Sequence, residues 1–316
     1  MRYRITCRSS FNAELERQSL IAGLLAPNAA ISPKYFYDEL GCLLYLAICR
    51  LPEYYLTRTE ASIFTQNTEA IASAVGTGKQ LVDLGAGDCR KAAEWFPFLK
   101  PRRYFAVDIA KSHLEHALGR LAEEFPDTKI VGIVMDIAAG LQLDGDLGTR
   151  PATFFYPGSS IGNFSPNSVL QLLGQIRTHC HAPGSGLLIG VDAKKDAARL
   201  DAAYADPLGV TAAFNLNMLN HVNRLIGSDF DLNNFRHIGF YNELMGRVEM
   251  HLEARTDCAV RIGDSSRKFS AGERIHTENS YKYARHEFET LLHQAGFATI
   301  QCWQDKAQDF CVFYAT

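Results

Sequence analysis

The sequence has no apolar run approaching the ~18 residues of a membrane-spanning helix, and no secretory apolar segment. It also lacks a large excess of one charge, because 32 basic residues face 35 acidic ones and the formal net charge is −3. These absences disfavour a membrane protein and a nucleic-acid-binding protein. We therefore expect a cytoplasmic protein without a membrane or nucleic-acid partner.

No CxxC pair occurs among the eight cysteines, which stand singly along the chain. This scatter favours reduced thiols over disulfides or a zinc site, so we expect no metal. The sequence also has no internal repeat and no low-complexity tract. What it does have is 316 residues, 47% of them hydrophobic, enough for one large domain or two modest ones with a real core.

A glycine turn lies between an apolar strand and the start of a helix in residues 80–91, QLVDLGAGDCRK. Gly85 and Gly87 let the backbone approach a ligand closely, and the helix N-terminus offers unpaired N–H groups. Such a unit is typical of a nucleotide-binding α/β domain. Arg90 holds the place of the third glycine of the dinucleotide fingerprint. The turn therefore favours S-adenosylmethionine, which has no pyrophosphate, over a nicotinamide cofactor.

Two acids follow the next two expected strands. Asp108 ends a strand over 104–107, 21 positions after Gly87 (108 − 87), where one carboxylate can accept both ribose hydroxyls of an adenosine. Asp136 follows a strand over 129–134, where an acid can accept the exocyclic amine of adenine. Asp108 could instead be a surface acid at a strand end. With the glycine turn, the two acids predict an adenosine site.

A strand over 152–156 runs into PGSSIGNFSP at its carboxyl end, where α/β sheets keep their active sites. The Asn163 side chain both donates and accepts hydrogen bonds, so it can hold a carboxylate and contact an amine. The alternative is a turn residue or a cap for the helix that follows Pro166.

The parallel α/β pattern continues to a strand over 186–191, is then interrupted, and resumes near residue 285. We predict an α/β, Rossmann-like core of residues 60–195 and 285–316. A second, α+β lobe of residues 1–59 and 196–284 is expected to bind the substrate. This lobe contains five tyrosines between residues 35 and 55, which either lie at the edge of the core or surround a small polar ligand. Expected elements include helices over 11–25, 60–75 and 91–99, and antiparallel strands over 236–241, 247–254 and 258–262.

Five motifs, LPEYY, GSSIGN, VTAAFN, RVEMHL and HTENSYKY, resemble those of the histidine-specific, S-adenosylmethionine-dependent Nα-methyltransferases of ergothioneine biosynthesis. The resemblance covers nearly the whole chain. It implies a seven-strand class I methyltransferase core with a separate substrate-binding lobe. It also implies successive transfer of three methyl groups to the α-amine of L-histidine, giving hercynine and S-adenosylhomocysteine without a metal.

The resemblance further implies a role for each matching residue. It places the histidine carboxylate against Asn163 and Tyr204, and the imidazole near Tyr54, Glu278 and Ser280, with Met250 beside it. Tyr37 and the Gly158 backbone would lie near the amine, so Tyr37 and Asn163 are the candidate catalytic residues. The matching donor-binding residues are Gly85, Lys91, Asp108 and Asp136, beside Gly87 from the turn itself. Departures from the family are the turn GAGDCRK and the residues Tyr281 and Tyr283 around Lys282.

Other functions stay open at this point. The substrate could be another amino acid, such as a tryptophan derivative, or methylation could stop at one or two groups. A non-catalytic adenosine-binding module and a nicotinamide dehydrogenase are further alternatives. Glu278 and Ser280 argue against an indole pocket, which would be expected to lack such an acid–serine pair. An apolar amino acid would leave the buried acid unpaired. We expect the enzyme to be a monomer.

Overall fold

The computed structural model describes residues 3–8, 13–143 and 145–316, which form two compact units. The first unit comprises Met1–Ser10, Leu56–Lys194 and Lys282–Thr316, and the second comprises Phe11–Tyr55 and Lys195–Tyr281. The first two positions of the helix expected over 11–25 lie outside the described residues. Within the described ranges, every helix is too short or too polar to cross a membrane.

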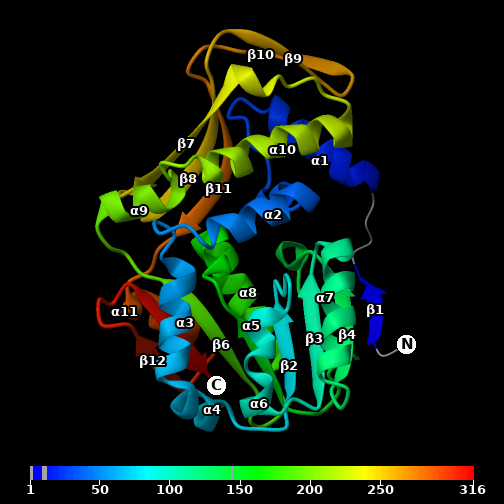
Figure 1. The fold of residues 1–316 in the computed structure, drawn as a ribbon, viewed down its shortest axis with the longest axis vertical. Coiled ribbons are helices and arrows are strands. Elements are labelled where there is room, and N and C mark those ends of the chain that lie inside the picture. The colour runs from blue at the N-terminus through cyan, green and yellow to red at the C-terminus, as the bar shows by residue number, and fades with distance from the viewer. Residues whose placement is uncertain (1–2, 9–12, 144) are drawn as a thin grey trace. The chain divides into compact units, whose positions relative to one another are not determined.

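The first unit is built on one eight-stranded sheet (Figure 1). The strand order is β1-β4-β3-β2-β5-β6-β13-β12, and neighbours are parallel except that β13 runs antiparallel to β6 and β12. Strands β2, β5 and β6 are buried at every position, as expected for strands covered on both faces. The strands are β1 (Tyr3–Cys7), β2 (Gln80–Leu84), β3 (Arg103–Asp108), β4 (Lys129–Val134), β5 (Ala152–Tyr156), β6 (Gly186–Asp192), β12 (Ile300–Gln304) and β13 (Phe310–Ala315).

Seven of these strands are those of the expected Rossmann-like methyltransferase core, and β1 is an addition to it. Each residue of β1 pairs in parallel with a residue of β4, from Ile130 to Val134. This differs from the expected division of the chain, which placed residues 1–59 in the second lobe. An edge strand of five residues with no fully buried position gives little periodicity to detect.

Helix α7 covers β3 and β4 in the first unit (Figure 1). Gly132 of β4 lacks a side chain where the Leu118 side chain approaches, since a Cβ there would lie 2.5 Å from its Cδ1. The helix expected over 60–75 is divided at Asn67, whose φ of −120° is not helical. The helix expected over 91–99 is also divided in two, because a new helix begins at Phe96 with Pro97 in its first turn. The helices are α3 (Leu56–Gln66), α4 (Thr68–Val75), α5 (Arg90–Ala93), α6 (Phe96–Leu99), α7 (Lys111–Glu124), η2 (Ile137–Ala139), η3 (Ser160–Asn163), α8 (Pro166–His179) and α11 (Arg285–Gln294).

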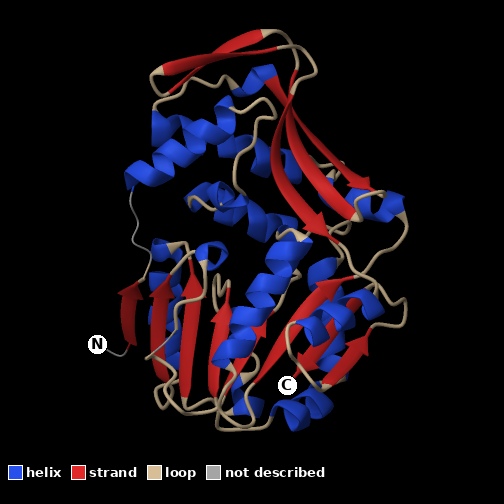
Figure 2. Ribbon diagram, turned by 180° about the vertical axis from the view of Figure 1, so that it is seen from behind, coloured by secondary structure: helices blue, strands red, loops and turns tan. Residues whose placement is uncertain are grey.

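The second unit combines a three-stranded antiparallel sheet, in the order β11-β8-β7, with a separate two-stranded ribbon of β9 and β10 (Figure 2). The long helix α10 packs against α2, and the Phe214 ring of α10 stacks on Phe36 with ring centroids 4.5 Å apart. Strands β10 and β11 were not among the expected ones. The elements are α1 (Ala13–Leu25), η1 (Pro33–Phe36), α2 (Glu39–Ile48), α9 (Ala197–Tyr204), α10 (Val210–Ile226), η4 (Leu232–Asn234), β7 (Phe235–Asn242), β8 (Arg247–Ala254), β9 (Cys258–Ile262), β10 (Ser265–Phe269) and β11 (Arg274–Tyr281).

Candidate active site

The glycine turn follows β2 directly and is tied to the neighbouring strand. The N–H groups of Gly85 and Ala86 donate to the Val107 carbonyl at 2.9 and 3.0 Å. Gly85 and Gly87 have φ values of 69° and 53°, where a side chain would be strained. A Cβ on Gly85 would meet no atom within 4 Å, so the space beside the turn is open. This backbone can therefore lie directly against a bound donor molecule.

Asp108 connects the end of β3 to this turn. Its Oδ2 accepts the Gly87 N–H at 2.8 Å, and its Oδ1 accepts the Ala110 N–H at 2.9 Å. Burial raises the pKa of the Asp108 carboxyl, and the two N–H groups act in the opposite direction. A carboxylate offers about four acceptor positions, so these two bonds leave it able to accept ribose hydroxyls.

Asp136 lies at the end of the next strand. The N–H of Met135 donates to the Asp108 carbonyl at 3.0 Å, which places the two acids at the carboxyl ends of adjacent strands. The Asp136 carboxylate also begins η2, because its Oδ1 accepts the Ala138 N–H at 2.9 Å. The first unit thus brings Gly85, Gly87, Asp108 and Asp136 to one edge of the sheet.

Lys91, the predicted donor-binding lysine, is paired with an acid that sequence reasoning missed. Its Nζ lies 2.7 Å from Oε2 of Glu60, whose side chain is only 1% exposed. Oε1 of the same carboxylate accepts the Gly158 N–H at 2.7 Å. One buried carboxylate therefore contacts both a predicted donor residue and a predicted substrate residue.

The loop after β5 is held by the backbone N–H of Asp192, at the end of β6. The Ser159 Oγ accepts the Asp192 N–H at 2.9 Å, and Ser159 itself has a φ of 58°. The Asp192 carboxylate is paired with the Lys282 ammonium at 2.8 Å, and neither side chain is exposed. Asn163 ends η3 four positions later and is half-buried. The loop that carries Gly158 and Asn163 is therefore held from β6.

A further buried acid, Asp83, lies in β2, two positions before Gly85 of the glycine turn. The Tyr104 O–H donates to Oδ2 of Asp83 at 2.6 Å, and both side chains are buried. The pKa of Asp83 is raised to about 7, mainly by burial and also by the nearby Asp108, against the Tyr104 hydrogen bond, which lowers it. Asp83 is therefore partly protonated near neutral pH.

In the second unit, aromatic rings surround the predicted amine-facing tyrosine. The Tyr37 ring lies 5.9 Å from Tyr45 and 6.0 Å from Phe214 between ring centroids, in edge-to-face contact. Tyr54 and Tyr204 form a second edge-to-face pair with centroids 6.0 Å apart. These edge-to-face contacts fix the orientation of the Tyr37 and Tyr54 rings within the second unit.

Two predicted imidazole-binding residues lie on β11. Glu278 is paired with Met250 of β8, and Ser280 with Val248, so all four side chains leave the same face of the sheet. The Ser280 and Tyr204 hydroxyls are 2.9 Å apart, and either can be the donor. The second unit therefore groups polar residues with an apolar methionine on one sheet face.

Burial and neighbouring side chains keep the Tyr54 hydroxyl protonated and therefore uncharged. Burial raises the pKa of the Tyr54 hydroxyl well above its usual value, and neighbouring Tyr45, Tyr204 and Glu278 raise it further. The hydroxyl is therefore a neutral donor and acceptor at neutral pH.

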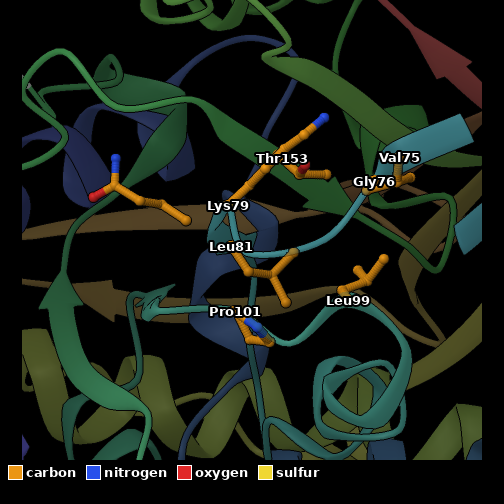
Figure 3. A pocket seen from close by; sticks show the side chains of 8 residues that line it. Val75, Gly76, Lys79, Leu81, Leu99, Pro101 and Thr153 are labelled. Carbon is orange, nitrogen blue, oxygen red and sulfur yellow. The ribbon is translucent and has the colours of Figure 1, made fainter. Parts of the chain in front are cut away.

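The predicted site residues are divided between the two units. Gly85, Gly87, Lys91, Asp108, Asp136, Gly158 and Asn163 lie in the first, and Tyr37, Tyr54, Tyr204, Met250, Glu278 and Ser280 in the second. A small pocket lined by Lys79, Leu81 and Thr153 lies at the amino ends of β2 and β5, away from the turn (Figure 3). It contains none of the predicted site residues.

Two residues near the site were not predicted to belong to it. Glu60 was expected only as the start of a helix, because sequence gives no sign that an acid is buried. Tyr45, one of the five clustered tyrosines, was given no role in the site, yet it is half-buried and its ring contacts Tyr37. The tyrosine cluster itself was the signal that could have included Tyr45.

Comparison with known proteins agrees with this geometry. The sequence profile of the family described as histidine-specific methyltransferase, S-adenosylmethionine-dependent, matches residues 16–316. The chain is 38% identical to the histidine N-alpha-methyltransferase of Mycolicibacterium smegmatis over 304 residues, which cover 94% of each chain. It is 37% identical to that of Mycobacterium tuberculosis, over 93% of this chain and 92% of the other. The ergothioneine biosynthesis protein 1 of Neurospora crassa is 32% identical over 84% of this chain and 31% of its own length. The chain therefore belongs to the family of histidine-specific, S-adenosylmethionine-dependent methyltransferases.

Proposed function

We propose that this enzyme methylates the α-amine of L-histidine up to three times, giving trimethylhistidine (hercynine) in the first step of ergothioneine biosynthesis. The observation that carries the proposal is the group on β11, where Glu278 and Ser280 share a face and Ser280 is hydrogen-bonded to Tyr204. A carboxylate can accept the imidazole N–H, and a hydroxyl can bond the other ring nitrogen. The similarity to histidine N-alpha-methyltransferases supports the same substrate.

The proposed roles follow from the chemistry of each group. S-adenosylmethionine supplies an electrophilic methyl carbon, so the chain's residues need only orient the amine and exclude water. Gly85, Gly87, Asp108 and Asp136 bind the adenosine, and Lys91 binds the amino-acid end of the donor. Tyr37, Asn163 and the Gly158 backbone orient the amine. Tyr204 and Asn163 hold the carboxylate of histidine, while Tyr54 and Met250 enclose its imidazole.

The amine must lose a proton before each transfer. No dedicated base is assigned to that step, because a tyrosine with a pKa near ~10 holds its proton at neutral pH and the proton can pass to water. The amine becomes quaternary after the third transfer and has no N–H left, so the reaction ends there. Tyr37, Tyr45 and Phe214 supply ring faces that favour this cation.

Mass spectrometry of the product tests the proposal directly. The purified chain, S-adenosylmethionine and L-histidine should give a product with three added methyl groups, and mono- and dimethylhistidine should also be converted. Tryptophan serves as the competing substrate, because its indole has an N–H donor but no ring nitrogen that accepts a hydrogen bond, so it cannot satisfy Glu278 and Ser280 together as imidazole can. Turnover of tryptophan but not histidine would refute the proposal.

We also propose that the enzyme is a cytoplasmic monomer with no nucleic-acid or membrane partner. The eight cysteines all lie in described positions as free thiols, which supports a reducing compartment. Light scattering after size-exclusion chromatography should give the mass of one chain. A dimer mass at micromolar concentration would contradict the monomer.

A further inference from the structure

We propose that Glu60 is a positioning residue for methyl transfer. Its buried carboxylate holds the Lys91 ammonium and the Gly158 backbone in one fixed arrangement. The inference rests on the proposed function, which assigns Lys91 to the donor and Gly158 to the amine. None of the motifs that identify the family assigns a role to Glu60.

Both oxygens of Glu60 have a partner. Oε2 lies 2.7 Å from Nζ of Lys91, and Oε1 accepts the Gly158 N–H at 2.7 Å. The side chain is 1% exposed, while that of Lys91 is 38% exposed. A buried carboxylate costs free energy unless it is paired and hydrogen-bonded, so these two contacts explain how it is tolerated. They also fix where both partners lie.

Gly190 of β6 provides the space that Glu60 occupies. A Cβ on Gly190 would lie 2.0 Å from Oε1 of Glu60 and 3.0 Å from Cε1 of Phe310. Gly190 is not among the glycines with positive φ, so its backbone does not require glycine. Glycine inside a buried strand weakens that strand and marks a close approach by another group. Here the group that approaches is the Glu60 carboxylate.

The loop that Glu60 holds is conformationally strained. The φ of 58° at Ser159 is strained for a residue with a side chain, while the φ of 82° at Gly158 is open to glycine. A strained conformation such as that of Ser159 persists only where the surroundings enforce it. The Lys91 Nζ lies within 3.4 Å of where a Cβ on Gly158 would be, so ammonium, carboxylate and peptide form one compact assembly. If the Glu60 carboxylate moved, Lys91, proposed to bind the donor, and Gly158, proposed to contact the amine, would move with it.

Two substitutions separate the two contacts. Glu60→Gln keeps an oxygen to accept the Gly158 N–H but removes the charge that holds Lys91. We expect it to raise the Kd of S-adenosylhomocysteine, measured by calorimetry, about tenfold, with the KM for histidine changed less than about twofold. Glu60→Ala removes both contacts, so it should also raise the KM for histidine and lower kcat about 100-fold.

Three controls accompany these variants. Glu69→Gln makes the same change at an exposed position of α4 and should leave Kd and kcat unchanged. In a Lys91→Met background, Glu60→Gln should add no further loss of S-adenosylhomocysteine affinity, because the pair is already broken. Thermal unfolding of each variant gives the folded fraction, and all constants are expressed per folded enzyme.

The outcomes distinguish the inference from the proposed function. Wild-type Kd and kcat in folded Glu60→Ala would overturn the inference, and so would a lowered Tm with unchanged constants. If the wild-type enzyme failed to methylate histidine while Glu60→Gln still weakened S-adenosylhomocysteine binding, the proposed function would fail. The role of Glu60 on the donor side would then stand.

Discussion

At the scale of single residues, Asp83 predicts a pH dependence of stability. Its pKa is about 7 in the folded chain, against about 3.9 for an unfolded aspartate. The folded state therefore binds more protons between these values, and stability falls as pH rises. The stabilisation from the protonated form is complete below pH ~4 and lost as pH rises through ~7. The difference of about 3 pKa units corresponds to an upper bound of about 4 kcal/mol.

Asp83→Asn tests this dependence. The amide is neutral at every pH and can still accept the Tyr104 O–H, so the free energy of unfolding should decline less between pH 4 and pH 7 than in the wild type. Urea unfolding at several pH values measures it, with Asp127→Asn on the exposed surface as the matched control. Parallel pH profiles for wild type and Asp83→Asn would refute the assignment.

Glu278 carries the prediction for substrate specificity. In the proposed role, Glu278 accepts the imidazole N–H, so Glu278→Ala should raise the KM for histidine about 100-fold or more. The KM for S-adenosylmethionine should change less than about threefold. Glu278→Gln should be milder, because its amide oxygen still accepts a hydrogen bond. Steady-state kinetics with each substrate varied give both constants, and equal effects on both would count against this role.

At the scale of elements, the end of β6 is stabilised by the Asp192–Lys282 pair. Neither side chain is exposed, so removing one partner leaves a buried charge without the other. We expect Lys282→Met to lower the free energy of unfolding by about 3–5 kcal/mol. Denaturant unfolding measures it, and the double variant Asp192→Asn/Lys282→Met should recover much of the loss. A loss below about 1 kcal/mol in Lys282→Met would contradict the prediction.

Helices and strands were predictable where burial on one or both faces produces a regular pattern of apolar residues. Strands over 129–134 and 152–156 have the predicted bounds, because their residues are almost all apolar. The strand β11 was missed because polar residues occupy most of its positions, and a bulge between His276 and Glu278 breaks its alternation. Two of these polar residues, Glu278 and Ser280, are the ones proposed to bind the substrate. The proposed substrate residues therefore helped to obscure the pattern that would have identified the strand.

At the scale of the whole molecule, the positions of the glycine turn and Asp108 were predictable, but the contacts that support the candidate site were not. The glycine turn and Asp108 follow from spacing, because a strand, a turn and a helix fix where the next strand's acid lies. Glu60 could not be inferred, since its partners Lys91 and Gly158 are 31 and 98 positions away. Such contacts depend on how separate helices and strands pack. The periodicity of apolar residues along the chain therefore gives no sign of these contacts.

Because the predicted site residues are divided between two units, we expect S-adenosylhomocysteine and histidine to protect different parts of the chain from hydrogen exchange. S-adenosylhomocysteine alone should slow hydrogen exchange in the first unit, at the amides of the glycine turn and of Ala110 beside Asp108. Adding histidine should extend protection to β8 and β11 in the second unit, where Glu278 and Met250 are paired. Exchange measured by mass spectrometry resolves both regions, and β9 and β10 serve as an internal control. Protection of β11 by S-adenosylhomocysteine alone, with no further change on adding histidine, would mean that the second unit does not bind the amino acid.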